Sequence, residues 1–182
     1  GGFTWWGESA LPLVRDLNTA EGRDFYGLDD AVLRGVSVVP FRVREGDEAS
    51  CLNLNRAQQP RLLGVKPALL ADRGAFTFAQ VEQGRNAGEG WTLLKPNPAT
   101  PDEIPAIGDA ASIQWALGRK VGDTLDYVDE RGQSFKVRLV AGVANSILQG
   151  NLIIDEAAFL RRFPGEAGHR DRKSTRLNSS HR

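Results

Sequence analysis

Hydrophobic and polar residues alternate most regularly in the last third of the chain. Within residues 134–140 the apolar side chains stand at every second position with cationic ones between them: Phe135, Val137 and Leu139 against Lys136 and Arg138. Side chains two positions apart lie on one face of a strand, so this segment predicts a strand with one buried and one exposed face. Residues 124–128 precede it across the turn-forming residues 129–132, which completes a predicted β-hairpin.

A second alternating segment covers residues 36–44. Phe41 and Val43 alternate with two arginines, which again predicts a strand with one exposed face. Pro40 lacks the backbone N–H that a central strand needs. We therefore expect this strand to lie at a sheet edge or to contain a bulge.

Two short helices are predicted from their capping residues. Asp109 is expected to cap a helix that runs to Leu117, with Gly118 in the left-handed conformation that ends many helices. A strand at residues 152–154 is followed by Asp155, the expected cap of a helix that ends at residues 163–165, Phe-Pro-Gly.

Residues 49–100 lack a regular period and are rich in proline and glycine. They predict a loop-rich segment with helical turns at 67–72 and a strand near 91–95. Taken together, the elements predict an α+β fold, a strand-dominated mixed or antiparallel sheet with short helices, in one domain over residues 1–170. A chain of this length can bury a sizeable core without disulfides or metals.

The last twelve residues, 171–182, differ from the rest in composition, with four cations, three serines and one apolar residue. Their sequence resembles the translation of a common sequencing adapter, so we interpret them as a non-native, disordered tail and exclude them from functional argument. Residues 1–170 then carry 19 basic and 22 acidic side chains, a net charge of −3. This weakly acidic balance argues against nucleic acid as the main partner.

The chain contains no methionine, which suggests an interior piece of a longer protein, incomplete at both ends. No apolar run reaches the length of a membrane-spanning helix, and residues 1–13 lack the features of a signal peptide. The single cysteine, Cys51, excludes an internal disulfide. Neither a metal nor another cofactor is predicted.

Few residues suggest catalysis. Cys51 and His169 could form a thiolate pair, but the sequence shows no third residue that would orient the histidine, and we expect a packed or idle cysteine instead. Five acidic doublets fit turn tips or helix starts, where carboxylates cap backbone N–H groups: 29–30, 47–48, 102–103, 129–130 and 155–156. No catalytic residue is predicted.

The tryptophans are candidate contact residues. Core packing is the favoured interpretation for Trp91 and Trp115. Trp5 and Trp6 are adjacent, and neighbouring strand residues face opposite ways, so both cannot enter one core. We therefore predict that Trp5 or Trp6 faces a second layer, a partner or a lipid headgroup region.

Five segments carry a resemblance to a known family: 46–56 (GDEASCLNLNR), 104–109 (IPAIGD), 117–127 (LGRKVGDTLDY), 146–150 (SILQG) and 159–164 (FLRRFP). Together they resemble the extracytoplasmic domain of FtsX-like, MacB-type ABC transporter permeases, over essentially all of residues 1–170. The resemblance implies a MacB-like periplasmic core fold, and it assigns residues 49–100 to an inserted lobe.

The resemblance also implies a non-catalytic role at the periplasmic face of the bacterial cytoplasmic membrane. Such a domain couples a cytoplasmic ATPase, through the permease's own transmembrane segments, to export or to an envelope partner such as a lipoprotein, lipid, peptide or drug. Two alternatives stay open from the residues alone. One is a secreted or periplasmic hydrolase that uses Cys51 and His169, and the other is a soluble partner-binding domain that uses Trp5 or Trp6.

Overall fold

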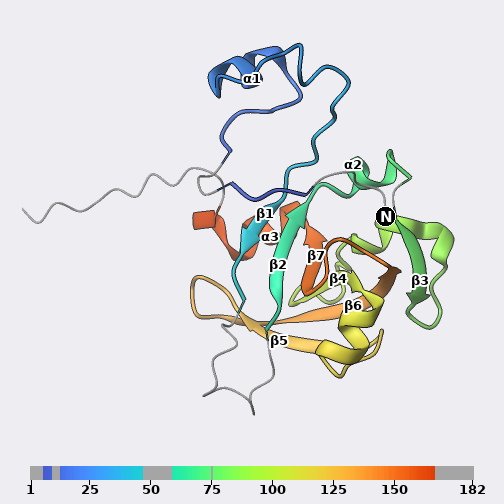
Figure 1. The fold of residues 1–182 in the computed structure, drawn as a ribbon. Coiled ribbons are helices and arrows are strands. Elements are labelled where there is room, and N and C mark those ends of the chain that lie inside the picture. The colour runs from blue at the N-terminus through green and yellow to red at the C-terminus, as the bar shows by residue number, and fades with distance from the viewer. Residues whose placement is uncertain (1–5, 10–12, 47–58, 75, 167–182) are drawn as a thin grey trace, which may run out of the picture.

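A computed structural model describes residues 6–9, 13–46, 59–74 and 76–166 of the chain (Figure 1). Seven strands form one mixed sheet with the order β1-β2-β7-β4-β6-β3, and β5 pairs with β6 outside this path. The strands are β1 (Arg42–Arg44), β2 (Arg61–Val65), β3 (Thr77–Val81), β4 (Glu103–Asp109), β5 (Thr124–Val128), β6 (Ser134–Ala144) and β7 (Asn151–Asp155). The predicted α+β class and the mixed sheet with short helices are confirmed.

The strands β2, β7 and β4 form the centre of the sheet and are buried on both faces. β2 runs parallel to β7, with Leu62 beside Leu152 and Leu63 beside Ile153, while β7 runs antiparallel to β4. Because both faces are covered, residues 62–65 of β2 are all buried and apolar and show no alternation. Residues 49–100 were expected to be rich in loops, yet their described part contributes both this central strand and the edge strand β3.

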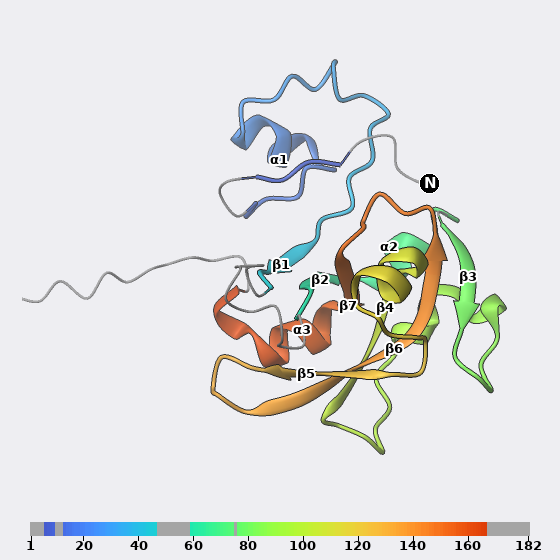
Figure 2. The same cartoon turned by 60° about the horizontal axis from the view of Figure 1, so that its bottom comes forward.

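The predicted hairpin is confirmed as β5 and β6, whose register pairs Leu125 with Val137 and Tyr127 with Phe135. β6 is 11 residues long and continues beyond the hairpin to pair with β3 on the same side, while β4 lies parallel to it on the other. The register shifts between Ala106 and Ile107 of β4. Such a bulge increases local twist, which suits the curl of β5 and β6 (Figure 2).

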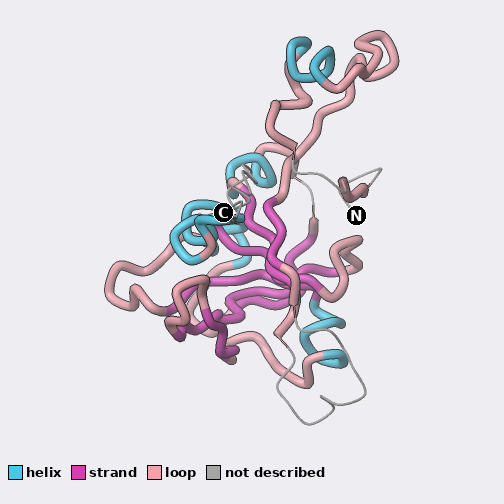
Figure 3. Tube along the Cα trace, turned by 90° about the vertical axis from the view of Figure 1, so that its left-hand side faces the viewer, coloured by secondary structure: helices cyan, strands magenta, loops and turns pink. Residues whose placement is uncertain are grey.

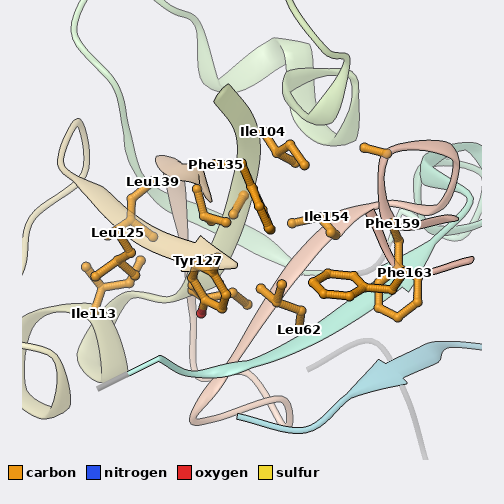
Figure 4. Packing of buried hydrophobic residues seen from close by; sticks show 14 residues of the cluster. Leu62, Ile104, Ile113, Leu125, Tyr127, Phe135, Leu139, Ile154, Phe159 and Phe163 are labelled. Atoms are coloured by element: carbon orange, nitrogen blue, oxygen red, sulfur yellow. The ribbon is translucent and has the colours of Figure 1, made fainter. Parts of the chain in front are cut away.

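One face of the sheet is covered by α3 (Glu156–Arg162) and by the helical residues 110–116, of which Ser112–Ala116 form the π-helix η2. The core on this face contains 14 buried residues, including Phe159 of α3 and Phe163, which directly follows this helix (Figure 4). As predicted, Asp155 caps α3, since its carboxylate accepts the N–H groups of Ala157 and Ala158 at 2.8 and 3.2 Å.

The other face is covered by α2 (Pro67–Ala71), which agrees with the predicted helical turns, and by the 3-10 helix η1 (Ala87–Leu94). Trp91 lies in this core between the rings of Phe76 and Phe78, each at 5.5 Å between centroids. The predicted strand at 91–95 is therefore wrong. Asn86 and Glu89 form a capping box that starts η1, and Gly90, at φ 54°, kinks it.

Residues 13–39, here called the arm, stand off from the sheet (Figure 3), whereas residues 59–166 are called the sheet body. The arm contains α1 (Ala20–Phe25), and the predicted strand at 36–44 is reduced to β1 at its end, which does lie at the sheet edge. A short 3-10 turn, η3 (Pro164–Glu166), follows α3. Within the described residues, no helix has the length and apolarity needed to cross a membrane.

Candidate functional site

The acidic doublets in the described residues perform structural tasks, as predicted. In the first, Asp29 accepts the N–H of Ala31 at 2.8 Å, and Asp30 pairs with Arg23 at 2.6 Å. At 155–156, the cap of α3 is followed by Glu156, which pairs with Arg42 at 2.8 Å. The doublet 47–48 lies outside the described residues. No group of acidic, histidine or cysteine side chains in the described part of the chain has the arrangement of a metal site.

The doublets 102–103 and 129–130 meet at two arginines of the sheet body. Arg162 donates to Asp102 at 2.9 Å and to Asp129 at 3.4 Å, and its guanidinium lies 4.8 Å from the centre of the Phe135 ring. Arg138 joins Glu103, at 2.9 Å, to Glu82, at 2.7 Å. These pairs tie α3 and β3 to the hairpin.

The ion pairs and hydrogen bonds around Asp129 and Arg138 shift the pKa values of these two side chains in the direction that keeps each of them charged. The backbone N–H of Gln133 lowers the pKa of Asp129, aided by the N–H of Arg131 and by Arg162, while desolvation opposes the shift. The hydrogen bond to Glu82 raises the pKa of Arg138, with Glu103 contributing less. The set therefore forms an ion-pair network that connects these elements of the fold.

Asp109, predicted as a helix cap, has a second role that its position in the sequence does not reveal. Its Oδ1 accepts the N–H of Ser112 at 3.0 Å, which is the capping contact, and its Oδ2 accepts the N–H of Ser146 at 3.0 Å. The hydroxyl of Ser112 in turn accepts the N–H of Gly150 at 3.1 Å. One buried carboxylate at the end of β4 thereby holds η2 against the turn that leads into β7.

A pocket of about 530 Å³ opens beside this carboxylate. Ile113, Leu117 and Leu152 give it apolar walls, and Asp109 and Ser112 are among its polar lining. Arg61 also lines it, but its guanidinium is engaged by Glu8 and by Glu45, at 3.1 Å to the latter. The lining suits a ligand with an apolar body and one or two hydrogen-bonding groups.

Of the two tryptophans of which one is predicted to face a partner, the structure describes only Trp6. Trp5 lies outside the described residues. Trp6 is 38% exposed, and its indole packs edge-on against Phe41 with 5.5 Å between ring centroids. Trp6 is therefore anchored beside the sheet edge with part of its surface accessible, which is compatible with the predicted contact role.

Trp115 is the largest departure from the expected side-chain positions. Whereas Trp91 is buried as predicted, Trp115 is 78% exposed, so its expected core position is wrong. Ile113, two residues earlier on η2, is the side chain that enters the core. A short helix presents only one face inward, and the sequence contains no marker of which face that is.

The two residues of the alternative catalytic pair, Cys51 and His169, both lie outside the described residues. Both histidines of the chain and its single cysteine belong to the undescribed segments. The hypothesis of a hydrolase therefore has no support from described geometry.

Exposed apolar side chains gather in the arm. Large hydrophobic residues that are exposed there are Leu13, Val14, Phe25, Leu28, Val32 and Val36. Only Gly22 is buried within residues 13–39. A surface of this kind is typical of contact with another molecule.

Comparison of the chain with protein-family models and with curated proteins finds no match. The assignment of a function therefore rests on the residues and their geometry.

Proposed function

We propose that this chain is part of the extracytoplasmic domain of an FtsX-like, MacB-type ABC transporter permease. In this role the domain is non-catalytic and transmits the cycle of a cytoplasmic ATPase to export or to an envelope partner. It lies at the periplasmic face of the bacterial cytoplasmic membrane, attached to transmembrane segments of the same permease. A MacB-like periplasmic core fold belongs to the same proposal.

The observation that carries the proposal is the order of elements after residue 103. The helical residues 110–116 lead through Gly122, at φ 100°, into the hairpin β5–β6, after which β7 and α3 close the domain. This is the order that the resembling segments 117–127, 146–150 and 159–164 imply. Gly122 has a local reason to be glycine, since a side chain there would be strained at positive φ.

The use of the charged residues supports a non-catalytic role. In the sheet body the best-buried carboxylates cap backbone N–H groups or pair with arginines, so they stabilise the fold. The exposed apolar residues of the arm suit contact with another protein segment, which a coupling domain requires.

The first experiment is to extend the gene in both directions. The proposal expects a transmembrane helix on each side of these residues and an ATPase gene nearby. An open reading frame that encodes a soluble protein would contradict it.

A second experiment tests the location directly in the complete protein. In a cysteine-free background, the substitution Val128→Cys places a thiol at a position that is 50% exposed. We expect a membrane-impermeant maleimide to label it in cells with a permeabilised outer membrane. Labelling only after lysis would place the domain in the cytoplasm and overturn the proposal. The buried substitution Leu63→Cys serves as the control that stays unlabelled while the domain is folded.

A further inference from the structure

The arm is ordered by polar contacts, and apart from Val39 at its end its large apolar side chains lie outside the cores of the sheet. Thr19 caps α1 by accepting the N–H of Gly22 at 2.9 Å. The Asn18 side chain exchanges two hydrogen bonds with the backbone of Val38, at 2.8 and 2.9 Å, which closes the base of the arm. Phe25 is nevertheless 58% exposed, and Val32 is 75% exposed. The arm thus holds exposed apolar residues in a defined conformation, which favours contact with another molecule.

The arm is also acidic. Residues 13–39 contain five acidic side chains and three arginines, a net charge of −2. Two of the arginines are paired within the arm, Arg15 with Glu21 and Arg23 with Asp30. Asp24, next to Phe25, has no ion pair among the described residues. An anionic lipid surface would repel such an arm, and a basic apolar surface would attract it.

A surface of that kind is present elsewhere on the same chain. Trp115 exposes 78% of its surface on η2, and the segment that follows carries the exposed cations Arg119 and Lys120. Neither cation has an ion pair with any described residue, and Trp115 contacts no other described ring. We call these three residues the basic patch. It combines a large aromatic side chain with positive charge, as many interface centres do.

The arm and the helical segment that contains η2 lie apart in the fold. In Figure 1 the arm with α1 is at the top and the yellow helical segment that contains η2 is at the bottom. In this structure the two surfaces are not in contact within one molecule, so the arm of a second copy is the candidate occupant of the patch.

We propose that the arm of one copy of this chain docks on the basic patch of a second copy. Val32 and the part of Phe25 that Arg15 leaves open pack against Trp115 of the other copy, and Asp24 lies near its Arg119 and Lys120. The contact joins two different surfaces, so it is head-to-tail, and it can either close between two copies that exchange arms or extend to further copies. This inference concerns surfaces of the chain and does not depend on the proposed transport role.

Sedimentation of the full 182-residue chain over a range of concentrations tests the association. We expect the mass to rise above the 19.9 kDa of one chain as the concentration increases, and to fall again at high salt, because salt screens the charge attraction. A chain that remains at one-chain mass at every soluble concentration would overturn the proposal.

Two double variants then test which surfaces meet. The arm variant is Phe25→Ser with Val32→Ser, and the patch variant is Trp115→Ser with Lys120→Glu. Each alone is expected to associate at least about tenfold more weakly than the unchanged chain. The matched control is Val128→Ser on β5. Val128 is a half-exposed apolar residue that belongs to neither surface, so this variant should associate as strongly as the unchanged chain.

Mixing the two variants gives the decisive result. The patch variant keeps an intact arm and the arm variant keeps an intact patch, so an equal mixture should form a two-chain species and nothing larger. A mixture that stays at one-chain mass would overturn the head-to-tail contact. Association that survives in both variants would also overturn the head-to-tail contact. A chain that never self-associates but binds neutral lipid vesicles through its arm would overturn it as well. Circular dichroism of both variants shows that the sheet body stays folded, since all four positions are exposed.

Discussion

Phe159 in the sheet body and Phe25 in the arm are the same side chain in opposite surroundings. Phe159 is fully buried between α3 and β2, while Phe25 is mostly exposed at the end of α1. The sheet body has two apolar cores, one on each face, and the arm has none. Apolar burial therefore stabilises the sheet body, and local hydrogen bonds hold the arm. Substitutions of one residue type in both regions should have very different effects.

The largest expected difference is between Phe159→Ala and Phe25→Ala. The first removes a ring from a closed core and should lower the free energy of unfolding by roughly 3–5 kcal/mol. The second should change it by less than about 0.5 kcal/mol, because the ring is already solvated. Denaturant titration of both variants measures the difference. Equal losses would show that the arm shares the core of the sheet body.

Two glycines give a smaller contrast. A methyl group on Gly64 of β2 would lie 2.7 Å from Cγ of Phe159, whereas one on Gly7 would meet nothing within 4 Å. We expect Gly64→Ala to destabilise by about 1–3 kcal/mol through overpacking. Gly7→Ala, at a position with ordinary φ, should be near neutral. The thermal midpoints of both variants provide the measurement, and a neutral Gly64→Ala would mean that α3 can shift away from β2.

The carboxylates should differ in their pH dependence. The pKa of Asp129 is lowered in the folded chain by the N–H of Gln133, so folding favours its charged form. Its contribution is therefore present above its unfolded pKa and is lost as the pH falls through the lower folded pKa. Asp129→Asn should destabilise near pH 7, and its difference from the unchanged chain should shrink toward acidic pH.

The matched substitution in the arm is Asp24→Asn. The Asp24 side chain makes no ion pair with the described residues, so this variant should change the free energy of unfolding near pH 7 by less than about 0.5 kcal/mol. Urea unfolding at several pH values separates the two variants. A constant difference for Asp129→Asn across the acid range would contradict the linkage.

The smallest global effect is expected from the cap of α1. Thr19→Ala removes the bond to the N–H of Gly22 and should weaken α1 locally by about 1 kcal/mol. Because the arm has no core, the unfolding of the sheet body should be unchanged. Hydrogen exchange should show faster exchange confined to residues 20–26. Faster exchange in β6 as well would show that the arm and sheet body unfold together.

Elements with local determinants were predictable from the sequence. The hairpin follows from the alternation at Phe135, Val137 and Leu139, and α3 follows from the cap Asp155 and the terminating residues 163–165. Gly118, at φ 59°, ends the helical residues 110–116 in the predicted left-handed conformation. Each of these features depends on residues within a few positions of one another, so local physics is sufficient.

Elements that depend on burial were missed or misassigned. β2 is only five residues long and is apolar on both faces, so it resembles any short apolar run between two prolines. The apolar residues 91–94 resemble a strand, yet the Asn86 and Glu89 capping box and the positive φ of Gly90 make them part of η1. The capping box was the available sequence signal for η1.

The sequence by itself determined the α+β class, the hairpin, the edge position of the strand around Val43 and the structural use of the acidic doublets in the described residues. Only the tertiary structure decided that Trp91 is buried and Trp115 exposed, that Asp109 holds two segments together, and that the arm stands apart from the sheet body. The physical reason is the distance along the chain over which each interaction acts. Alternation and capping act between neighbours in the chain, whereas the burial of a side chain depends on which distant segments cover it.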